Sequence, residues 1–194
     1  MAALEKVQAL IDRYALAAHP EGGYFREVYR SQRKVTRKEK SYSALTDIYF
    51  LLPLGSLSVF HRITAEEVWH FYEGAPLRLI QSDPGLSTLT ETLLGDGEYK
   101  HCIPAGHWQA AESTGDYSLV GCTVAPGFEF EDLEIMRAVT ESGRRISRQY
   151  PTLSRFLAEG SRRCSRVRQM GPSSVQSDWK LRFTLCQIAL KQRG

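Results

Sequence analysis

The sequence contains no apolar run that could cross a membrane. A spanning helix needs about 18 consecutive apolar residues, and none occurs among the 194 residues of this chain. The N-terminal segment MAALEKVQALIDRYALAAHP is interrupted by Glu5, Lys6, Asp12 and Arg13. A signal peptide needs an uninterrupted apolar core at this position. We therefore expect a cytoplasmic protein.

Cysteine is scarce, and its spacing excludes a zinc ribbon or a redox pair. The four cysteines, Cys102, Cys122, Cys164 and Cys186, contain no CxxC spacing. Without a secretory signal they are expected to be reduced thiols. Cys102 and Cys122 lie in apolar segments and are predicted to be inert core thiols.

Two common catalytic motifs are also missing. No GxSxG is present, and Gly22-Gly23 is not followed by the Lys-Ser/Thr of a phosphate-binding loop. The composition is otherwise that of an ordinary soluble domain, with 42% hydrophobic and 24% charged residues. Neither nucleotide hydrolysis nor serine-hydrolase chemistry is indicated.

Charge divides the chain into two parts. Residues 137–194 hold 13 basic and 3 acidic side chains, whereas residues 1–136 hold 12 basic and 19 acidic ones. We therefore expect a domain over 1–136 and a basic C-terminal extension over 137–194. Within the extension, residues 150–159 and 178–192 have helical spacing, and residues 160–177 have a composition typical of disorder.

The first part combines one helix with many short strands. Residues 3–18 place apolar side chains on one helical face, and His19-Pro20-Glu21-Gly22-Gly23 ends that helix. A charged, mobile loop is expected over residues 31–41. The predicted strands are 24–30, 47–52, 57–63, 67–72, 77–81, 88–93, 101–103, 108–111 and 117–124. Short strands at spacings near ten residues indicate an all-β sandwich or barrel.

The segment GSLSVFHRITAEEVWHFYEG, residues 55–74, matches the spacing of the first cupin motif, G-x5-H-x-H-x3,4-E-x6-G, with one change. His61 and Glu67 occupy the first histidine and the glutamate, and Ile63 replaces the second histidine. The second motif matches more loosely. Pro104-Ala105-Gly106 fits its P-x-G, and Gln109 occupies its histidine position.

Four phrases resemble one group within the cupin superfamily, the cupin_5 or DUF985 family. They are HPEGGYFREVYRS, HRITAEEVWHFYEG, IPAGHWQAAES and LVGCTVAPGFEFEDLEI, and they occur in the family's order. The resemblance covers roughly residues 4–136 and implies a jelly-roll β-barrel with an interior pocket. It also implies a homodimer, but it supplies no reaction.

At two of the motif positions, the residues Ile63 and Gln109 are poorer metal ligands than histidine. Residues alternate across a strand, so His61 and Ile63 share a face, and converging strands can bring His61, Glu67 and Gln109 around one point. Such a set would suit a divalent transition metal. Ile63 contributes no donor atom, however, and an amide binds metal more weakly than imidazole. His70 is a substitute ligand only if a bulge turns it inward.

The preferred hypothesis is therefore a pocket for a small polar, sugar-like or anionic ligand. His61 would act as the base of metal-independent, isomerase- or epimerase-like chemistry, with Glu67 orienting it or carrying a proton. The residues predicted to bind the ligand are Arg26, His61, Glu67, Trp69, Phe71, Trp108 and Gln109. A purely structural role for His61, Glu67 and Gln109, as partners for one another, is the simplest alternative.

Two further functions remain open from the sequence. One is a metal-dependent, oxygenase-like enzyme that uses His61, Glu67 and Gln109. The other is a non-enzymatic binding or interaction module, with the basic extension as the element that contacts a partner. The arginines of the extension lack aromatic interleaving and any known binding motif. Contact with nucleic acid or a membrane is therefore not expected.

Overall fold

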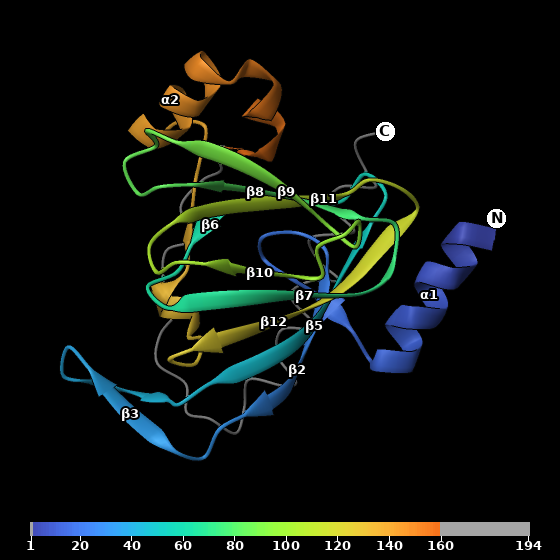
Figure 1. Cartoon of the computed structure of the whole chain (residues 1–194), viewed down its shortest axis with the longest axis horizontal. Helices are drawn as coiled ribbons and strands as arrows, with labels where there is room; N and C mark the ends of the chain where they lie inside the picture. Colours follow the sequence, from blue (N-terminus) through green and yellow to red (C-terminus); the bar gives the residue numbers. More distant parts are fainter. Residues whose placement is uncertain (1, 160–194) are drawn as a thin grey trace, which may run out of the picture. The chain divides into compact units, whose positions relative to one another are not determined.

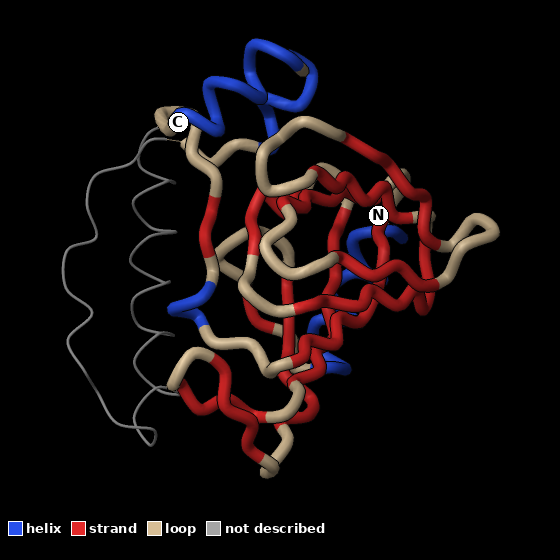
Figure 2. The backbone as a smooth tube through the Cα atoms, turned by 60° about the vertical axis from the view of Figure 1, so that its left-hand side comes forward, coloured by secondary structure: helices blue, strands red, loops and turns tan. Residues whose placement is uncertain are grey.

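Runs of β-branched and aromatic residues form the strands of two antiparallel sheets. The structure is a computed structural model that describes residues 2–159 (Figure 1). One sheet has six strands in the order β1-β2-β5-β12-β7-β10, and the other has five in the order β13-β6-β11-β8-β9. Figure 2 shows the strands gathered together, with the helical segments around them. The predicted β-rich, antiparallel fold with an N-terminal helix is confirmed.

The element bounds follow the predicted strands closely. The strands are β1 (Ala17–Ala18), β2 (Tyr24–Arg30), β3 (Lys34–Arg37), β4 (Lys40–Ser43), β5 (Thr46–Pro53), β6 (Leu57–Arg62), β7 (Glu66–Gly74), β8 (Leu77–Ser82), β9 (Leu89–Leu94), β10 (Lys100–Ile103), β11 (Trp108–Ser113), β12 (Tyr117–Ala125) and β13 (Glu134–Ile135). The helical segments are α1 (Ala2–Tyr14), the 3-10 helix η1 (Phe130–Asp132), α2 (Glu141–Gln149) and the 3-10 helix η2 (Pro151–Phe156).

Helix α1 is shorter than the predicted range of 3–18. It ends at Tyr14, because Ala15 takes a positive φ of 49° and breaks the helical repeat. The apolar face of the helix packs Val7 and Leu10 against Leu51 and Leu119 of the six-stranded sheet. The chain after the helix therefore returns along the sheet edge, where β1 pairs with β2.

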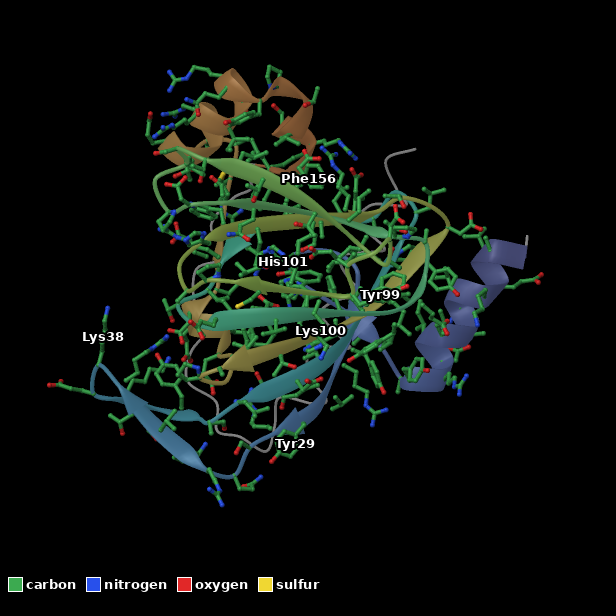
Figure 3. All side chains as sticks on the ribbon, in the orientation of Figure 1. Tyr29, Lys38, Tyr99, Lys100, His101 and Phe156 are labelled. Carbon is green, nitrogen blue, oxygen red and sulfur yellow. The ribbon has the colours of Figure 1, made fainter. Side chains whose placement is uncertain are left out.

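The loop expected over residues 31–41 is instead a β-hairpin made of β3 and β4. It forms a separate two-stranded sheet, and Figure 3 shows Lys38 at its outer end. Tyr42 is buried beneath the guanidinium of Arg37 and the ammonium of Lys40, each 4.9 Å from its ring centroid. These cation–π contacts and the strand pairing order a segment whose composition alone indicates a loop.

Residues 137–159 belong to the same compact unit as the barrel, which spans Met1–Gly160. Ile146 of α2 and Phe156 of η2 are fully buried in a cluster with Phe60 and Trp108 of the barrel. The compact unit therefore extends past the predicted boundary at 136, because this apolar layer covers the outer face of the five-stranded sheet. In place of the helix expected over 150–159 the chain forms the short η2, and α2 precedes that range.

The segments predicted over 160–177 and 178–192 lie outside the described residues. Within residues 2–159, no helix is long and apolar enough to cross a membrane.

Candidate functional site

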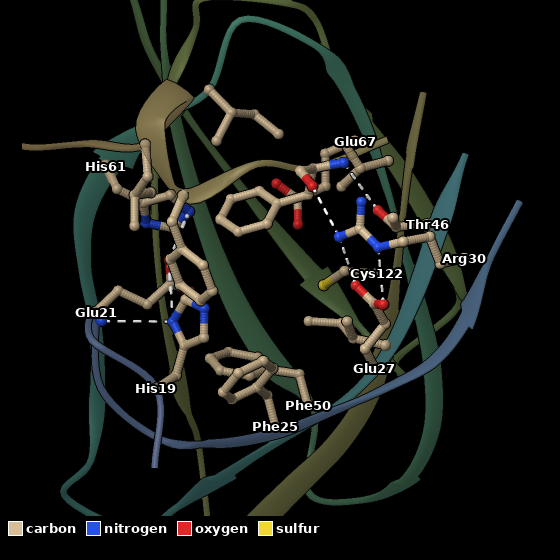
Figure 4. A pocket seen from close by; sticks show the side chains of 16 residues that line it. His19, Glu21, Phe25, Glu27, Arg30, Thr46, Phe50, His61, Glu67 and Cys122 are labelled. Atoms are coloured by element: carbon tan, nitrogen blue, oxygen red, sulfur yellow. Dashed lines mark hydrogen bonds and ion pairs between the residues drawn. The ribbon is translucent and has the colours of Figure 1, made fainter. Parts of the chain in front are cut away.

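A pocket lies between the two sheets, with a volume of about 60 Å³. Its walls come from β2, β5, β7 and β12 of one sheet and from β6 of the other. The turn before β2 and the segment around η1 complete it. Figure 4 shows His61, Glu21 and His19 on one side of the pocket and Arg30, Glu27 and Thr46 on the other. Segments distant in sequence thus meet at one small cavity.

The turn that carries Glu21 approaches β6 unusually closely, and glycine makes this approach possible. Gly22 has a φ of +110°, and a Cβ built on it would lie 1.9 Å from the Leu57 carbonyl oxygen. The backbone N–H of Val59 donates to the Glu21 carbonyl at 2.9 Å. Only a residue without a side chain permits this contact, which places the Glu21 carboxyl against β6.

A β-bulge on β6 presents two polar side chains to that carboxyl. Ser58 is opposite Ala111, whereas His61 is opposite Gln109, so β6 contains one extra residue between the two pairs. Regular alternation would place Ser58 and His61 on opposite faces of the strand, but the extra residue brings them to the same face. As a result, Ser58 Oγ donates to Glu21 Oε1 at 2.9 Å, and His61 Nε2 lies 3.1 Å from Glu21 Oε2.

The hydrogen bonds of His61 assign its tautomer. Nδ1 lies 2.8 Å from the Val59 carbonyl oxygen, which can only accept, so Nδ1 carries a proton and donates it. Burial lowers the pKa of His61 and raises the pKa of Glu21. Both shifts favour a pair of neutral groups, in which the protonated Glu21 carboxyl donates a hydrogen bond to Nε2.

His19 adds a second imidazole to this group. Its Nδ1 lies 3.6 Å from Glu21 Oε2, and burial lowers the pKa of the imidazole. Its ring packs edge-on against Phe25 at 4.6 Å and stacks on Phe130, with the ring centroids 6.0 Å apart and an angle of 30° between the ring planes. An acidic group and two imidazoles therefore share one side of the pocket.

Glu67 supplies a second buried carboxyl to the pocket. Gln109 Nε2 donates to Glu67 Oε2, and Trp69 Nε1 donates to Gln109 Oε1 at 2.8 Å. The indole thus fixes which end of the amide faces Glu67. The Cys122 thiol also donates to Glu67. Burial is the largest influence on this carboxyl and raises its pKa, although these hydrogen bonds oppose the shift.

Arg30 lies at the mouth because a second bulge alters the alternation of β2. Glu27 is opposite Ile48 and Tyr29 is opposite Asp47, so Val28 is an extra residue. Arg30 consequently lines the pocket with Glu27. Its Nε and Nη2 donate to the two oxygens of Glu27 at 2.9 and 2.8 Å.

The structure separates the sequence-predicted residues into three groups. His61 and Glu67 line the pocket. Gln109 and Trp69 lie behind Glu67 and orient it, as described above. The remaining predicted ligand-binding residues, Arg26, Phe71 and Trp108, do not line the pocket.

Each of these three residues has a different surrounding from the one expected. Arg26 is exposed and donates to the Tyr14 carbonyl oxygen at 3.1 Å, at the end of α1. Phe71 packs farther along the barrel core, next to Gly95. Trp108 lies on the outer face beneath η2, in the cluster that contains Phe156. Its neighbour Gln109 faces inward, so alternation turns Trp108 outward.

The residues at the motif positions do not fit a metal centre. Ile63 has no donor atom and packs in an apolar cluster with Val124. Both ends of the Gln109 amide are engaged by Trp69 and Glu67. His70, the proposed substitute, bonds to Thr123 outside the pocket. In the described part of the chain, no three His, Cys, Asp or Glu side chains form a group that could hold a metal.

The sequence analysis missed Glu21, His19 and Arg30 as site residues and assigned Cys122 only to the core. A usable signal existed in His19-Pro20-Glu21-Gly22-Gly23, where two titratable side chains precede a glycine pair. For Arg30, simple alternation predicts the same face as Arg26, and only the bulge at Val28 brings it to the pocket.

A β-barrel of two antiparallel sheets with a pocket between them, and with the motif residues on β6 and β7, defines a cupin. The chain belongs to the Cupin_5 family of the cupin superfamily, also described as DUF985, whose sequence profile matches residues 8–136. The family predicted from the sequence is thereby confirmed.

Two solved structures are similar over most of their length. A hypothetical protein from Leishmania major is 31% identical, with 77% of this chain and 95% of that chain covered and a TM-score of 0.66. A protein from Shewanella oneidensis is 34% identical, with 76% and 92% covered and a TM-score of 0.64. No curated protein matches the chain.

Proposed function

We propose that this cupin binds a small polar molecule in the pocket and transfers a proton on it without a metal, as an isomerase or epimerase does. The observation that supports the proposal is the pair of buried carboxyl groups, Glu21 and Glu67, that face one cavity. Burial raises the pKa of each. Carboxyl groups tuned toward neutral pH can take up and release protons under working conditions.

The proposed step needs no oxidant or cofactor. One glutamate, as the carboxylate, removes a proton from a carbon beside a carbonyl group, and the C–H electron pair shifts onto the carbonyl oxygen to give an enolate. The other glutamate, as the carboxylic acid, gives its proton to the carbon skeleton as the enolate reverts to a carbonyl. The product is an isomer of the substrate, and one proton has moved from one glutamate to the other.

His61 is assigned a positioning role instead of the role of base expected from its motif position. Its Nδ1 proton is engaged by Val59, and its Nε2 faces Glu21 instead of open cavity. Its Nε2 therefore accepts a hydrogen bond from the protonated Glu21 carboxyl and can exchange the proton with it. Removing the imidazole should leave Glu21 without its main hydrogen-bond partner and slow proton transfer.

Solvent-exchange NMR tests the proposal. The purified protein is incubated in D2O with a panel of aldoses, ketoses, amino sugars and hydroxy- or keto-carboxylates, and deuterium incorporation at carbon is followed. We expect exchange for one chemical class, with a loss of about 100-fold or more in Glu67→Gln and Glu21→Gln. His107→Ala is the matched histidine control for His61→Ala, because His107 contacts Gln81 outside the pocket.

The outcomes separate the competing functions. Exchange that persists in both glutamine variants would contradict the carboxyl mechanism. Binding of a panel compound without exchange would leave a non-enzymatic binding protein, which is the alternative function left open by the sequence.

A further inference from the structure

The pocket has an excess of acidic groups and very little basic charge. Glu21, Glu27 and Glu67 all line it. Among its described lining residues, Arg30 is the only arginine or lysine. The two histidines, His19 and His61, both have a pKa lowered by burial and contribute little positive charge near neutral pH. This excess of acidic groups favours a ligand that carries positive charge.

The guanidinium of Arg30 is already committed to protein acceptors. Besides the two oxygens of Glu27, it donates through Nη1 to Glu129 at 2.8 Å and through Nη2 to the Phe128 carbonyl at 3.0 Å. An anionic ligand would have to displace one of these carboxylates. Arg30 therefore neutralises the rim of the pocket and is not available as an anion clamp.

The two inner carboxyl groups have hydrogen-bond partners but no cation among the described residues. Glu21 contacts Ser58 and the imidazoles of His61 and His19. Glu67 contacts the Gln109 amide and the Cys122 thiol. Burying an ionised carboxylate without a countercharge is costly. A cation that enters the cavity would supply the countercharge that these carboxyls need in order to ionise.

The remaining walls suit a cation as well. Phe25, Phe50, Phe128 and Phe130 line the same pocket, and Phe128 and Phe130 pack edge to face at 5.0 Å. Aromatic faces attract ammonium groups, most strongly where the cation is partly desolvated. The carboxyl groups inside the pocket and the aromatic rings around them each favour a cationic ligand, through different interactions.

We propose that the ligand of this pocket carries a protonated amine on a small polar skeleton, and that the pocket disfavours carboxylates and phosphates of similar size. The inference rests on the proposed ligand site but not on the proposed reaction. It replaces the anionic ligand that the sequence left open, since Arg26 lies outside the pocket and Arg30 is engaged.

Three small probes of matched size test the charge preference on the wild-type protein. Ethanolamine, ethylene glycol and glycolate share a hydroxyl group on two carbons and differ in the charge at the other end. Their affinities are compared at neutral pH by chemical-shift titration of the pocket resonances. We expect ethanolamine to bind at least about tenfold more tightly than ethylene glycol, with glycolate the weakest.

Variants locate the binding to the two carboxyls. Glu67→Gln and Glu21→Gln are each expected to weaken ethanolamine about tenfold while changing ethylene glycol little, because only the charge is removed. Glu98→Gln is the matched control, since Glu98 is exposed and does not line the pocket. If one inner variant fails to fold, the other and the wild-type probe series still decide the question.

Several results would overturn the inference. These are equal binding of the three probes, preferred binding of glycolate, no detectable binding of ethanolamine, and unchanged ethanolamine affinity in both glutamine variants. Carbon-bound exchange on a neutral or anionic compound, without ethanolamine binding, would overturn this inference and leave the proposed reaction intact. Ethanolamine binding without exchange on any compound would support this inference and contradict the proposed reaction.

Discussion

Glu21 and His61 depend on each other for their protonation states. The imidazole Nδ1 has a fixed acceptor in Val59, so Nε2 can only accept from Glu21 in the neutral pair. Burial shifts both groups toward their neutral forms. A charged ligand or a change in pH would therefore act on the pair as a unit, and neither residue would titrate independently.

The buried Glu67 carboxyl should make stability depend on pH in a defined direction. Its folded-state pKa is raised above the ordinary value of 4.5, so the folded state binds the proton more tightly than the unfolded state. The free energy of unfolding must then fall as pH rises above 4.5 toward the folded-state pKa. Each unit of pKa shift corresponds to about 1.4 kcal/mol.

Glu67→Gln should remove this loss while keeping an oxygen that accepts from Gln109. The melting temperature of the variant is expected to match that of the wild type below pH 4.5 and to exceed it increasingly at higher pH. Calorimetry from pH 4 to pH 8 measures the difference, with Glu98→Gln as the control. A difference that shrinks with rising pH would contradict the assignment.

Trp69 and Trp108 offer a matched test of one hydrogen bond. Both indoles are almost completely buried, but only Trp69 Nε1 has a partner, the Gln109 oxygen. Trp108 Nε1 has none among the described residues. Trp69→Phe should leave the Gln109 oxygen unsatisfied and cost about 1–3 kcal/mol more in unfolding free energy than Trp108→Phe, as urea denaturation measures. Equal costs would show that the bond is not stabilising.

At the scale of single elements, the turn before β2 is the most demanding piece of backbone. Gly22→Ala adds a Cβ that meets the Leu57 carbonyl oxygen, whereas Gly97→Ala meets nothing within 4 Å. Both glycines have positive φ, so both substitutions strain the backbone by roughly 1–2 kcal/mol. Gly22→Ala should cost clearly more in chemical denaturation and should also weaken ligand binding, because Glu21 moves. Similar losses at both positions would argue against the close contact.

Alternation along strands explains which parts of the site the sequence could predict. It places Glu67 and Trp69 inside, and the structure agrees. It also implies that Trp108 and its neighbour Gln109 cannot both face the pocket. The bulges on β2 and β6 break this rule, and no residue type in the sequence marks their positions. The inward direction of Arg30 and the joint presentation of Ser58 and His61 were therefore beyond sequence reasoning.

For the molecule as a whole, the C-terminal layer is part of the folding unit. Phe156 is fully buried and packs edge to face on Phe60 at 6.1 Å. Phe156→Ala should cost about 3–5 kcal/mol of unfolding free energy. Phe130→Ala is the matched control, because Phe130 is 55% exposed and should cost much less. If the two variants are equally stable, the layer is not integral to the barrel.

The spacing of the motif positions in residues 55–74 was enough to identify the barrel, because it fixes two consecutive strands that lie in different sheets. The residues that line the pocket could not be predicted from the sequence in the same way. Glu21 reaches His61 only through a turn 40 positions earlier in the chain, and that contact depends on tertiary packing around Gly22. Fold and family thus followed from local pattern, whereas the acid–base group required the assembled structure.

Carbon-13 NMR titration of the side-chain carboxyl groups of Glu21 and Glu67 tests the central claim most directly. The glutamine variants assign the two resonances. Both carboxyls are expected to titrate above 4.5, and addition of ethanolamine is expected to lower at least one midpoint, because a bound cation favours the carboxylate. Midpoints at or below 4.5 for both groups, with no response to ethanolamine, would contradict the account of this pocket as a proton-transfer site for a cationic ligand.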